Sequence, residues 1–212
     1  MPCCHCQGVD DIFDARVAAR ELRQYRRRGP RKTTRLLLDA LRAAGVRGRT
    51  LLDVGGGVGV IQRELLRAGA AQASEVEAAP AYLAAAREEA ARQGHAERLR
   101  LHRGDFVALA PELPPADIVT LDRVICCYPD MPALVGLSAA HARRVYGLVY
   151  PRDTWWVKVG LALGNLALRL RRNPFRVYAH PAAAVDALVR RAGLAPRFAR
   201  RTLVWQVVVY GR

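Results

Sequence analysis

The segment DVGGGVG, residues 53–59, constrains the fold of this chain more than any other feature. It follows the apolar run TLLDV, which has the composition of a buried strand, and precedes VIQRELLRAGA, whose apolar spacing predicts a helix. Glycines at alternate positions let the backbone adopt positive φ and approach a ligand, and the free N–H groups of the helix start would face that ligand. The order of strand, glycine turn and helix predicts an α/β unit with a polar ligand at its turn.

The same alternation continues along the chain. Further strands are predicted at residues 73–77, 98–105, 116–122 and 143–150, helices at 60–69, 80–94, 131–142 and 182–193, and a closing strand pair within 196–212. This pattern is typical of an α/β fold with a doubly wound, seven-stranded, mostly parallel sheet, in which the hairpin makes one terminal strand antiparallel. Residues 10–44 predict a helical preface that breaks in two at RRRGP, residues 26–30. We expect a Cys-rich tail and helical preface that acts as a lid over 1–45, and the main domain over 46–212.

Net charge and length limit the classes of partner. A formal charge of +15 is typical of proteins that bind polyanions, but arginine is scattered along the chain and no RNA-binding signature with interleaved aromatics occurs, so nucleic acid is a less favoured partner. The chain has no apolar run of the ~20 residues that cross a bilayer, and no signal peptide at its start. We expect a cytoplasmic protein and leave its oligomeric state open.

The glycine spacing separates two cofactor classes. The dinucleotide fingerprint GxGxxG would place its third small residue at Val60, which fits NAD or FAD poorly. The form DxGxGxG, with Asp53, Gly55, Gly57 and Gly59, resembles motif I of class I S-adenosylmethionine-dependent methyltransferases. The resemblance covers roughly residues 30–150 and implies a Rossmann-like fold, an enzyme that transfers methyl groups, and S-adenosylmethionine as cofactor. It also implies that the glycines pack beside the methionine part of the cofactor and that Asp53 orders the loop and the amino group.

Further cofactor contacts follow from the same resemblance. Glu77 ends the second predicted strand, where a carboxylate can accept both ribose hydroxyls; a solvated acid at a helix start is the alternative. Asp105 would receive the adenine amino group and Phe106 would cover the ring, although Asp105 also suits a helix N-cap. Tyr25 and Thr34, in the helical preface, are expected to close over the carboxylate end of the cofactor.

The candidate catalytic residues follow the fourth strand. Asp122 stands at the position of the family's motif IV, which faces the methyl donor and the substrate, and a carboxylate there can favour a sulfonium charge. In the segment RVICCYPD, Cys127 and Tyr128 are expected to line the transfer site, while Cys126 and Cys127 could instead be small buried hydrophobes. His180 is a candidate base or substrate hydrogen bonder; the favoured alternative is a structural turn residue.

An apolar helix is predicted over WWVKVGLALGNLALRLRR, residues 155–172. We expect it to pack on the sheet; alternatively it roofs a hydrophobic substrate pocket, or rests on a membrane surface with Arg169, Arg171 and Arg172 facing lipid phosphates. The layout after the fifth strand is similar to that of methyltransferases of the magnesium-protoporphyrin type, which act on large apolar molecules. A small or apolar acceptor is therefore the favoured substrate.

The N-terminal CCHC cluster suggests other functions. Cys3, Cys4, His5 and Cys6 have the ligand chemistry of a soft metal, but adjacent cysteines fit one tetrahedral site poorly, so we predict no metal site. If the tail folds over Cys127, these thiols could present a thiophilic acceptor, as arsenite methyltransferases do; a disordered tail is the alternative. The hypotheses kept beside the small-molecule enzyme are methylation of a metalloid or thiol, an RNA or protein methyltransferase, and a non-enzymatic metal- or metalloid-binding protein. The acceptor atom and the use of a general base stay open.

Overall fold

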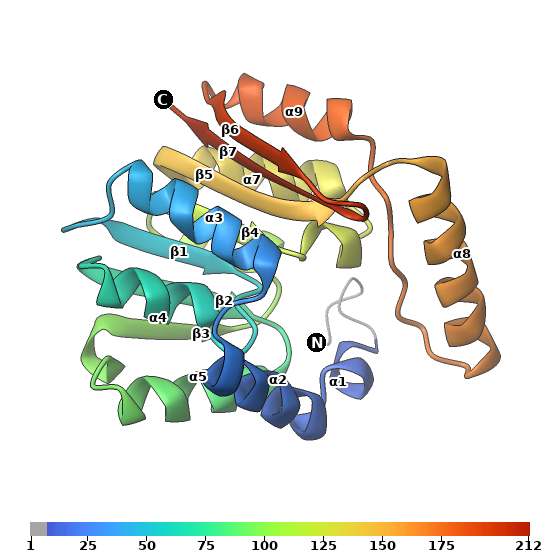
Figure 1. Cartoon of the computed structure of the whole chain (residues 1–212), viewed down its shortest axis with the longest axis horizontal. Coiled ribbons are helices and arrows are strands. Elements are labelled where there is room, and N and C mark those ends of the chain that lie inside the picture. The colour runs from blue at the N-terminus through green and yellow to red at the C-terminus, as the bar shows by residue number, and fades with distance from the viewer. Residues whose placement is uncertain (1–7) are drawn as a thin grey trace.

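One sheet of seven strands organises residues 8–212, the part of the chain that the computed structural model describes. In chain order the strands are β1 (Thr50–Val54), β2 (Gln72–Glu77), β3 (Leu99–Arg103), β4 (Ala116–Asp122), β5 (Ala142–Pro151), β6 (Ala195–Arg201) and β7 (Trp205–Gly211). Across the sheet they lie in the order β3-β2-β1-β4-β5-β7-β6, and β7 is antiparallel to both of its neighbours (Figure 1). The predicted doubly wound, mostly parallel sheet with one antiparallel strand is confirmed.

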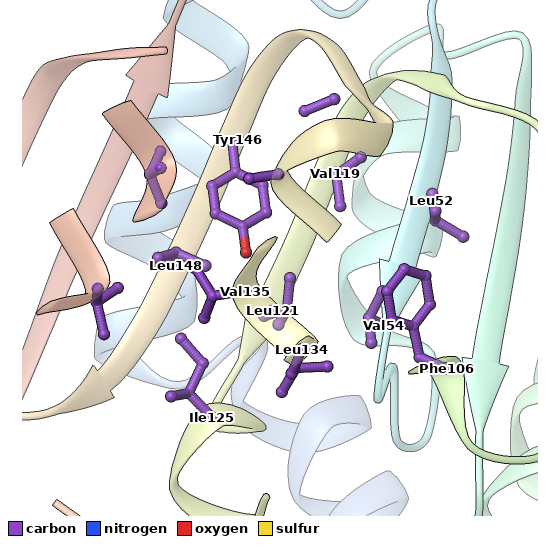
Figure 2. Close-up of a cluster of buried hydrophobic side chains, with 14 of the residues drawn as sticks. Leu52, Val54, Phe106, Val119, Leu121, Ile125, Leu134, Val135, Tyr146 and Leu148 are labelled. Atoms are coloured by element: carbon purple, nitrogen blue, oxygen red, sulfur yellow. The ribbon is translucent and has the colours of Figure 1, made fainter. Parts of the chain in front are cut away.

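Helices cover both faces of this sheet (Figure 1). They are α1 (Val9–Ile12), α2 (Ala15–Arg28), α3 (Lys32–Ala43), α4 (Val60–Arg67), α5 (Pro80–Arg92), α6 (Phe106–Leu109), α7 (Met131–His141), α8 (Trp155–Leu170) and α9 (Ala182–Arg191), with 3-10 turns η1 (Ala96–Arg98), η2 (Ala110–Glu112) and η3 (Ile125–Cys127). Leucines of α3 and α4 pack on one face, while α7 and α9 pack on the other. In Figure 2, Leu134 and Val135 of α7 lie among Leu121, Tyr146 and Leu148 from the strands.

The N-terminal helices differ from the prediction in where they break. Helix α2 continues through the arginines at 26–28, since arginine is a good helix former, and ends where Gly29 adopts φ +70°. Its start is capped by Asp14, whose carboxylate accepts a hydrogen bond of 2.8 Å from the Val17 amide. Helix α3 belongs to the core that covers the sheet, whereas α2 packs against α5. The division of the chain at residue 45 stays a prediction.

Helix α8 contradicts the expected packing on the sheet. It stands beside the end of the sheet, at the right of Figure 1, and Val157 is its one buried residue. Two hydrogen bonds of the Asn165 side chain, to the amide and carbonyl of Val177 at 2.9 and 2.8 Å, attach it to the segment that returns to α9. The apolar composition of α8 is therefore not explained by burial.

The carboxyl ends of the parallel strands bring the predicted site residues to one edge. Strands β1, β2 and β4 are adjacent, and in their parallel register Asp53 stands opposite Glu75 on one side and Thr120 on the other. In open α/β sheets, ligands bind at this edge, beside the point where the strand order reverses. Here that point lies between β1 and β4.

Candidate functional site

The glycine loop between β1 and α4 has the conformation that its sequence requires. Gly55, Gly57 and Gly59 adopt φ of +64°, +61° and +78°, a region that residues with a Cβ rarely occupy. The Gly55 amide donates to the carbonyl of Val76 at 2.7 Å, which ties the loop to β2. Gly59 then stands as the N-cap of α4. Positive φ angles and a backbone hydrogen bond thus set the path of the loop.

The space around these glycines differs from one to the next. A Cβ on Gly55 would lie 2.5 Å from a methyl carbon of Val124, so close packing against the segment after β4 excludes a larger residue there. A Cβ on Gly57 would meet no described side chain nearer than Tyr82, at 3.7 Å, and both of these residues line a cavity. A methyl group at position 57 would therefore occupy the space that the cavity offers to a ligand.

Two buried carboxylates lie beneath the loop. The Asp53 carboxylate accepts hydrogen bonds from the Thr120 hydroxyl at 2.6 Å and from the Gln62 amide at 3.1 Å. Burial raises the pKa of Asp53 to about 7, against the opposing effect of the Thr120 hydrogen bond. Glu75 is fully buried, neither of its carboxyl oxygens has a hydrogen-bond partner among the described residues, and burial also raises its pKa well above the ordinary value. The site is thus built to hold acids in a poorly solvated place, where a cation would stabilise their charged forms.

Glu77 is not the solvated acid that the alternative prediction describes, because it is 8% exposed. One carboxylate oxygen accepts a hydrogen bond from the Gly57 amide at 3.0 Å, and the other accepts from the Ala79 amide at 2.9 Å. Burial raises the pKa of Glu77, while these two amides counteract the shift. The carboxylate therefore connects the end of β2 to the glycine loop.

Asp105, Phe106 and Tyr128 meet on the next part of the cavity. Asp105 is the N-cap of α6, where it accepts from the Val107 amide at 3.1 Å, and both of its oxygens lie within hydrogen-bond distance of the Tyr128 hydroxyl, at 3.0 and 2.9 Å. Phe106 lines the cavity but is 3% exposed and packs beside Val54 in the core (Figure 2). Asp105, which was predicted to bind the cofactor, and Tyr128, which was predicted to act in catalysis, are thus hydrogen-bonded to each other.

Asp122 ends β4 and is joined to the helical preface. One of its oxygens accepts a hydrogen bond of 2.6 Å from the Thr34 hydroxyl of α3. The other oxygen is buried without a hydrogen-bond partner among the described residues, although the Arg123 Nε lies 3.9 Å from it. Burial raises the pKa of Asp122, and the Arg123 charge opposes the shift. Asp122 thus lines the cavity with one oxygen bonded to Thr34 and the other buried.

A single cavity of about 430 Å³ connects these groups, a volume within the range of small-molecule sites. Its lining includes most of the predicted site residues: Tyr25, Thr34, Asp53, Gly55, Gly57, Glu77, Asp105, Phe106, Asp122, Cys127 and Tyr128. The lining also includes an apolar wall, formed by residues from the two ends of the chain: Val9, Phe13, Phe175, Val177 and Trp205. The cavity therefore combines acidic and apolar side chains.

Two predicted site residues do not line the cavity. Gly59 lies behind it as the cap of α4. The Nε2–H of His180 donates a hydrogen bond of 3.0 Å to the Tyr128 carbonyl, and its ring stacks on Tyr178, so the histidine holds the chain beside the cavity. Burial lowers the pKa of His180. This position fits the structural alternative better than the catalytic one.

The cysteines and Tyr25 have partners of their own. Cys126 is buried, Cys127 is partly exposed, and their sulfur atoms lie 3.7 Å apart. Within residues 8–212 no three His, Cys, Asp or Glu side chains are placed to hold a metal ion. The N-terminal cluster of Cys3, Cys4, His5 and Cys6 lies outside the described residues.

Tyr25, which lines the cavity, also has a partner of its own. Its hydroxyl donates a hydrogen bond of 2.7 Å to the Glu64 carboxylate.

Several residues that line the cavity carry no recognisable signal in the sequence. Arg123 adopts φ +65°, donates a hydrogen bond to the Thr33 hydroxyl at 2.6 Å and stacks its guanidinium 5.1 Å from the Trp205 ring. Because arginine is frequent throughout this chain, an arginine after a strand does not stand out as a functional residue. Phe13 and Phe175 contact each other edge to face at 5.6 Å, although they are far apart in the sequence. The signal that could have indicated these two residues is the occurrence of an isolated aromatic residue in a polar segment.

No helix in the described part of the chain is long and apolar enough to cross a membrane.

Comparison with known proteins places the central part of the chain in one family. Residues 51–144 match the family described as a methyltransferase domain. A ribosomal protein L11 methyltransferase from Yersinia pseudotuberculosis is 31% identical over 127 residues, which cover 57% of this chain and 43% of that protein. A second one, from Citrobacter koseri, is 32% identical over 126 residues. The chain thus spans less than half the length of these curated relatives.

Solved structures agree on the fold. The magnesium protoporphyrin IX methyltransferase from Synechocystis, solved with bound SAH, superimposes with a TM-score of 0.68 at 19% identity over 85% of this chain and 81% of that one. An O-methyltransferase family protein from Burkholderia thailandensis gives 0.70 at 19% identity over 96% and 62%. With the matched domain, the sheet order and the glycine loop in agreement, residues 51–144 form a methyltransferase domain, and the chain has the class I, Rossmann-like methyltransferase fold.

Proposed function

We propose that the protein transfers the methyl group of S-adenosylmethionine to a small or apolar molecule that binds against the wall of Phe13, Phe175, Val177 and Trp205. The observation that carries this proposal is the mixed lining of the cavity, in which the glycine loop and buried acids occur together with these apolar side chains. The wall residues lie outside residues 51–144, the part shared with other methyltransferases. The matched part would therefore supply most of the cofactor contacts, and the segments outside it would select the acceptor.

The residues present fit the proposed cofactor. The carboxylates of Asp53, Glu77 and Asp122 line the cavity, and each has a pKa raised by burial, so a bound cation would be stabilised by their ionised forms. Gly57 leaves open the space that a Cβ would fill. We assign the cofactor contacts to the following residues: Gly55 and Gly57 beside the methionine part, Glu77 at the ribose, Asp105 and Phe106 at the adenine, and Tyr25 and Thr34 at the carboxylate end.

S-adenosylmethionine supplies a methyl carbon bound to a positively charged sulfur, and an in-line attack by the acceptor displaces that sulfur. The protein must then align the acceptor, exclude water and receive a proton if the acceptor is a neutral alcohol or amine. Asp122 suits the last task, because it lines the cavity and its raised pKa makes it a stronger base than an exposed aspartate. Tyr128 and Cys127 also line the cavity and would orient the acceptor.

Calorimetry and a turnover assay test the proposal. The purified chain is titrated with S-adenosylmethionine and with S-adenosylhomocysteine, and release of the latter is followed with a panel of apolar phenols, amines and carboxylic acids. We expect saturable cofactor binding and turnover with at least one acceptor class. Turnover should be lost in Asp122→Asn if the acceptor arrives protonated, and retained if it arrives ionised. A chain that ignores millimolar cofactor would refute the assignment.

Methylation of RNA or of a protein is the second candidate. The net charge of +15 and the similarity to ribosomal protein L11 methyltransferases favour it. Salt distinguishes the two, because a polyanionic substrate releases counterions on binding and its affinity falls steeply as salt rises, whereas an apolar acceptor binds almost independently of salt. A steep decrease of kcat/KM with salt for an RNA or ribosomal substrate would favour this candidate.

A thiophilic acceptor is the third candidate, favoured by the 3.7 Å contact between the sulfur atoms of Cys126 and Cys127 beside the cavity. Titration with arsenite tests it, with Cys127→Ser as the matched variant. Arsenite binding that is lost in this variant, together with methylated arsenic as product, would favour metalloid methylation. Binding without any turnover or cofactor affinity would favour a non-enzymatic metalloid-binding protein. Location in the cytoplasm and a lid function for residues 1–45 remain parts of the proposal.

A further inference from the structure

The outward face of α8 has a composition that normally belongs to a core. Trp155, Val159, Leu163, Leu166 and Leu170 recur every three or four residues, so they form one stripe along the helix. Their exposed fractions range from 51% to 79%, while the opposite side of the helix supplies the buried Val157. An amphipathic helix in a globular domain turns its apolar stripe inward, but this one turns it toward solvent.

The stripe continues beyond the helix. The Trp156 indole N–H donates a hydrogen bond of 3.3 Å to the Leu203 carbonyl in the turn between β6 and β7. Leu203 and Val204 in that turn are 75% and 40% exposed. The apolar surface, here named the α8 surface, therefore consists of the stripe together with Leu203 and Val204, and spans two elements that are distant in the sequence. Exposed apolar surface of this extent marks a contact with another phase or molecule.

The charges around the α8 surface have one sign. Between Asp153 and Asp186 the sequence contains no acidic residue, while Lys158, Arg169, Arg171 and Arg172 are all exposed. Lys158 and Arg169 flank the stripe on the helix, and the two further arginines follow its C-terminal end. A face with apolar and aromatic side chains in the middle, cations at its edge and no acids complements an anionic lipid surface. Two copies of this chain would instead bring these cations against one another, on molecules that each carry a formal charge of +15.

The α8 surface is also coupled to the cavity. Asn165, on the same helix, holds the backbone of Val177 with two hydrogen bonds, and both Val177 and the neighbouring Phe175 belong to the apolar wall of the cavity. Helix α8, which would contact the lipid, is therefore hydrogen-bonded to the segment that would contact the acceptor. An acceptor dissolved in the bilayer would thus lie close to the cavity.

We propose that the α8 surface docks on an anionic phospholipid bilayer, with the stripe in the headgroup region and the cations at lipid phosphates. The docking stands on the exposed stripe and its charges. That the acceptor is a lipid-soluble molecule taken up from this bilayer rests in addition on the proposed function. The substrate class is thereby narrowed from small or apolar molecules to those that partition into membranes.

Vesicle sedimentation of the full chain tests the docking. Vesicles of phosphatidylcholine with phosphatidylglycerol are compared with vesicles of phosphatidylcholine alone, and we expect binding to the first and little to the second. The double variant Leu163→Glu with Leu166→Glu should abolish binding. Arg171→Glu with Arg172→Glu should weaken it by about twentyfold or more, because each cation at an anionic surface contributes about a fivefold gain. The matched control, Arg143→Glu with Arg144→Glu at the start of β5, makes the same change of charge far from α8 and should keep binding.

Two results would overturn the docking. If the control loses as much binding as the arginine pair on α8, net charge and not this surface attracts the vesicles. If the chain ignores both vesicles and the Leu163→Glu, Leu166→Glu variant converts a dimer to a monomer in analytical ultracentrifugation, the surface is an interface between copies. Calorimetry with S-adenosylmethionine is run on every variant and should give the wild-type affinity. Cofactor binding without vesicle binding refutes the docking alone, and vesicle binding without cofactor binding refutes the proposed function alone.

Discussion

Replacing Gly57 with alanine separates the strain of the glycine loop from the space that the loop leaves for a ligand. Gly57 adopts φ +61°, and an alanine in this left-handed region costs roughly 1–2 kcal/mol. The added methyl group would contact only Tyr82, at 3.7 Å, so no clash within the described protein adds to this cost. For a domain of this size, 1 kcal/mol lowers Tm by about 2–4 °C. The variant should therefore fold and melt a few degrees below the wild type.

Gly57→Ala should weaken ligand binding more than it lowers the free energy of unfolding. The methyl group would project into the cavity, and forcing an additional methyl group into a packed contact costs about 1–3 kcal/mol. The dissociation constant of S-adenosylmethionine should accordingly rise by about five- to a hundredfold. The backbone N–H of residue 57 is kept by alanine, so the hydrogen bond to Glu77 does not account for the loss.

Gly94→Ala is the matched control. Gly94 follows α5, adopts φ +71° and has no atom within 4 Å of an added Cβ, so its replacement should cost the same strain far from the cavity. Thermal unfolding and calorimetry are measured for both variants. Equal losses of Tm with a cofactor defect in Gly57→Ala alone would support the reasoning. If Gly57→Ala binds the cofactor with wild-type affinity, the ligand does not pass beside this glycine and the assignment of the loop is wrong.

Three further perturbations test individual contacts. Thr34→Val removes the 2.6 Å hydrogen bond to the buried Asp122 carboxylate and should lower the free energy of unfolding in urea by about 1–3 kcal/mol, whereas Thr34→Ser should retain it. Because burial raises the pKa of Asp53 from 3.8 to about 7, the folded state holds this proton more tightly than the unfolded chain, so stability should fall by roughly 4 kcal/mol as pH rises from about 4 through about 7. Asp53→Asn should flatten this decline, and an unchanged slope would contradict the assigned cause. Asn165→Ala releases the backbone of Val177 and should raise the KM of the acceptor while cofactor affinity stays constant; equal effects on both would argue against a role in the acceptor wall alone.

The glycine loop and the acids of the cavity could be predicted because their determinants are local in the sequence. The positive φ of the glycine loop and the acids at the ends of β2 and β4 follow from short motifs placed after apolar strands, and parallel strands bring those ends together. Some boundaries were missed for local reasons as well: β3 ends at Arg103, before the predicted end at Asp105, because the Asp105 side chain caps the short helix α6.

The apolar wall of the cavity could not be predicted, because it is assembled from distant segments. Phe13 and Phe175 meet only after the sheet has formed, and neither lies in a recognisable motif. The packing of α8 failed for a different reason. Apolar periodicity indicates that a helix has an apolar face, but it does not indicate whether the protein core or a lipid bilayer covers that face. His180 shows the same limit, since its hydrogen bond to the Tyr128 carbonyl depends on tertiary contacts.

The position of β7 determines the order in which this fold can be completed. The strand lies between β5 and β6, yet it is the last of the described strands to be synthesised. During translation, the edges of β5 and β6 that pair with β7 therefore stay unpaired until residues 205–211 have been synthesised. A nascent chain interrupted before that point would present two open edges, each a template for pairing with another chain. Truncations that remove β7 should therefore aggregate, and a ribosome stalled before residue 205 would hold an aggregation-prone intermediate.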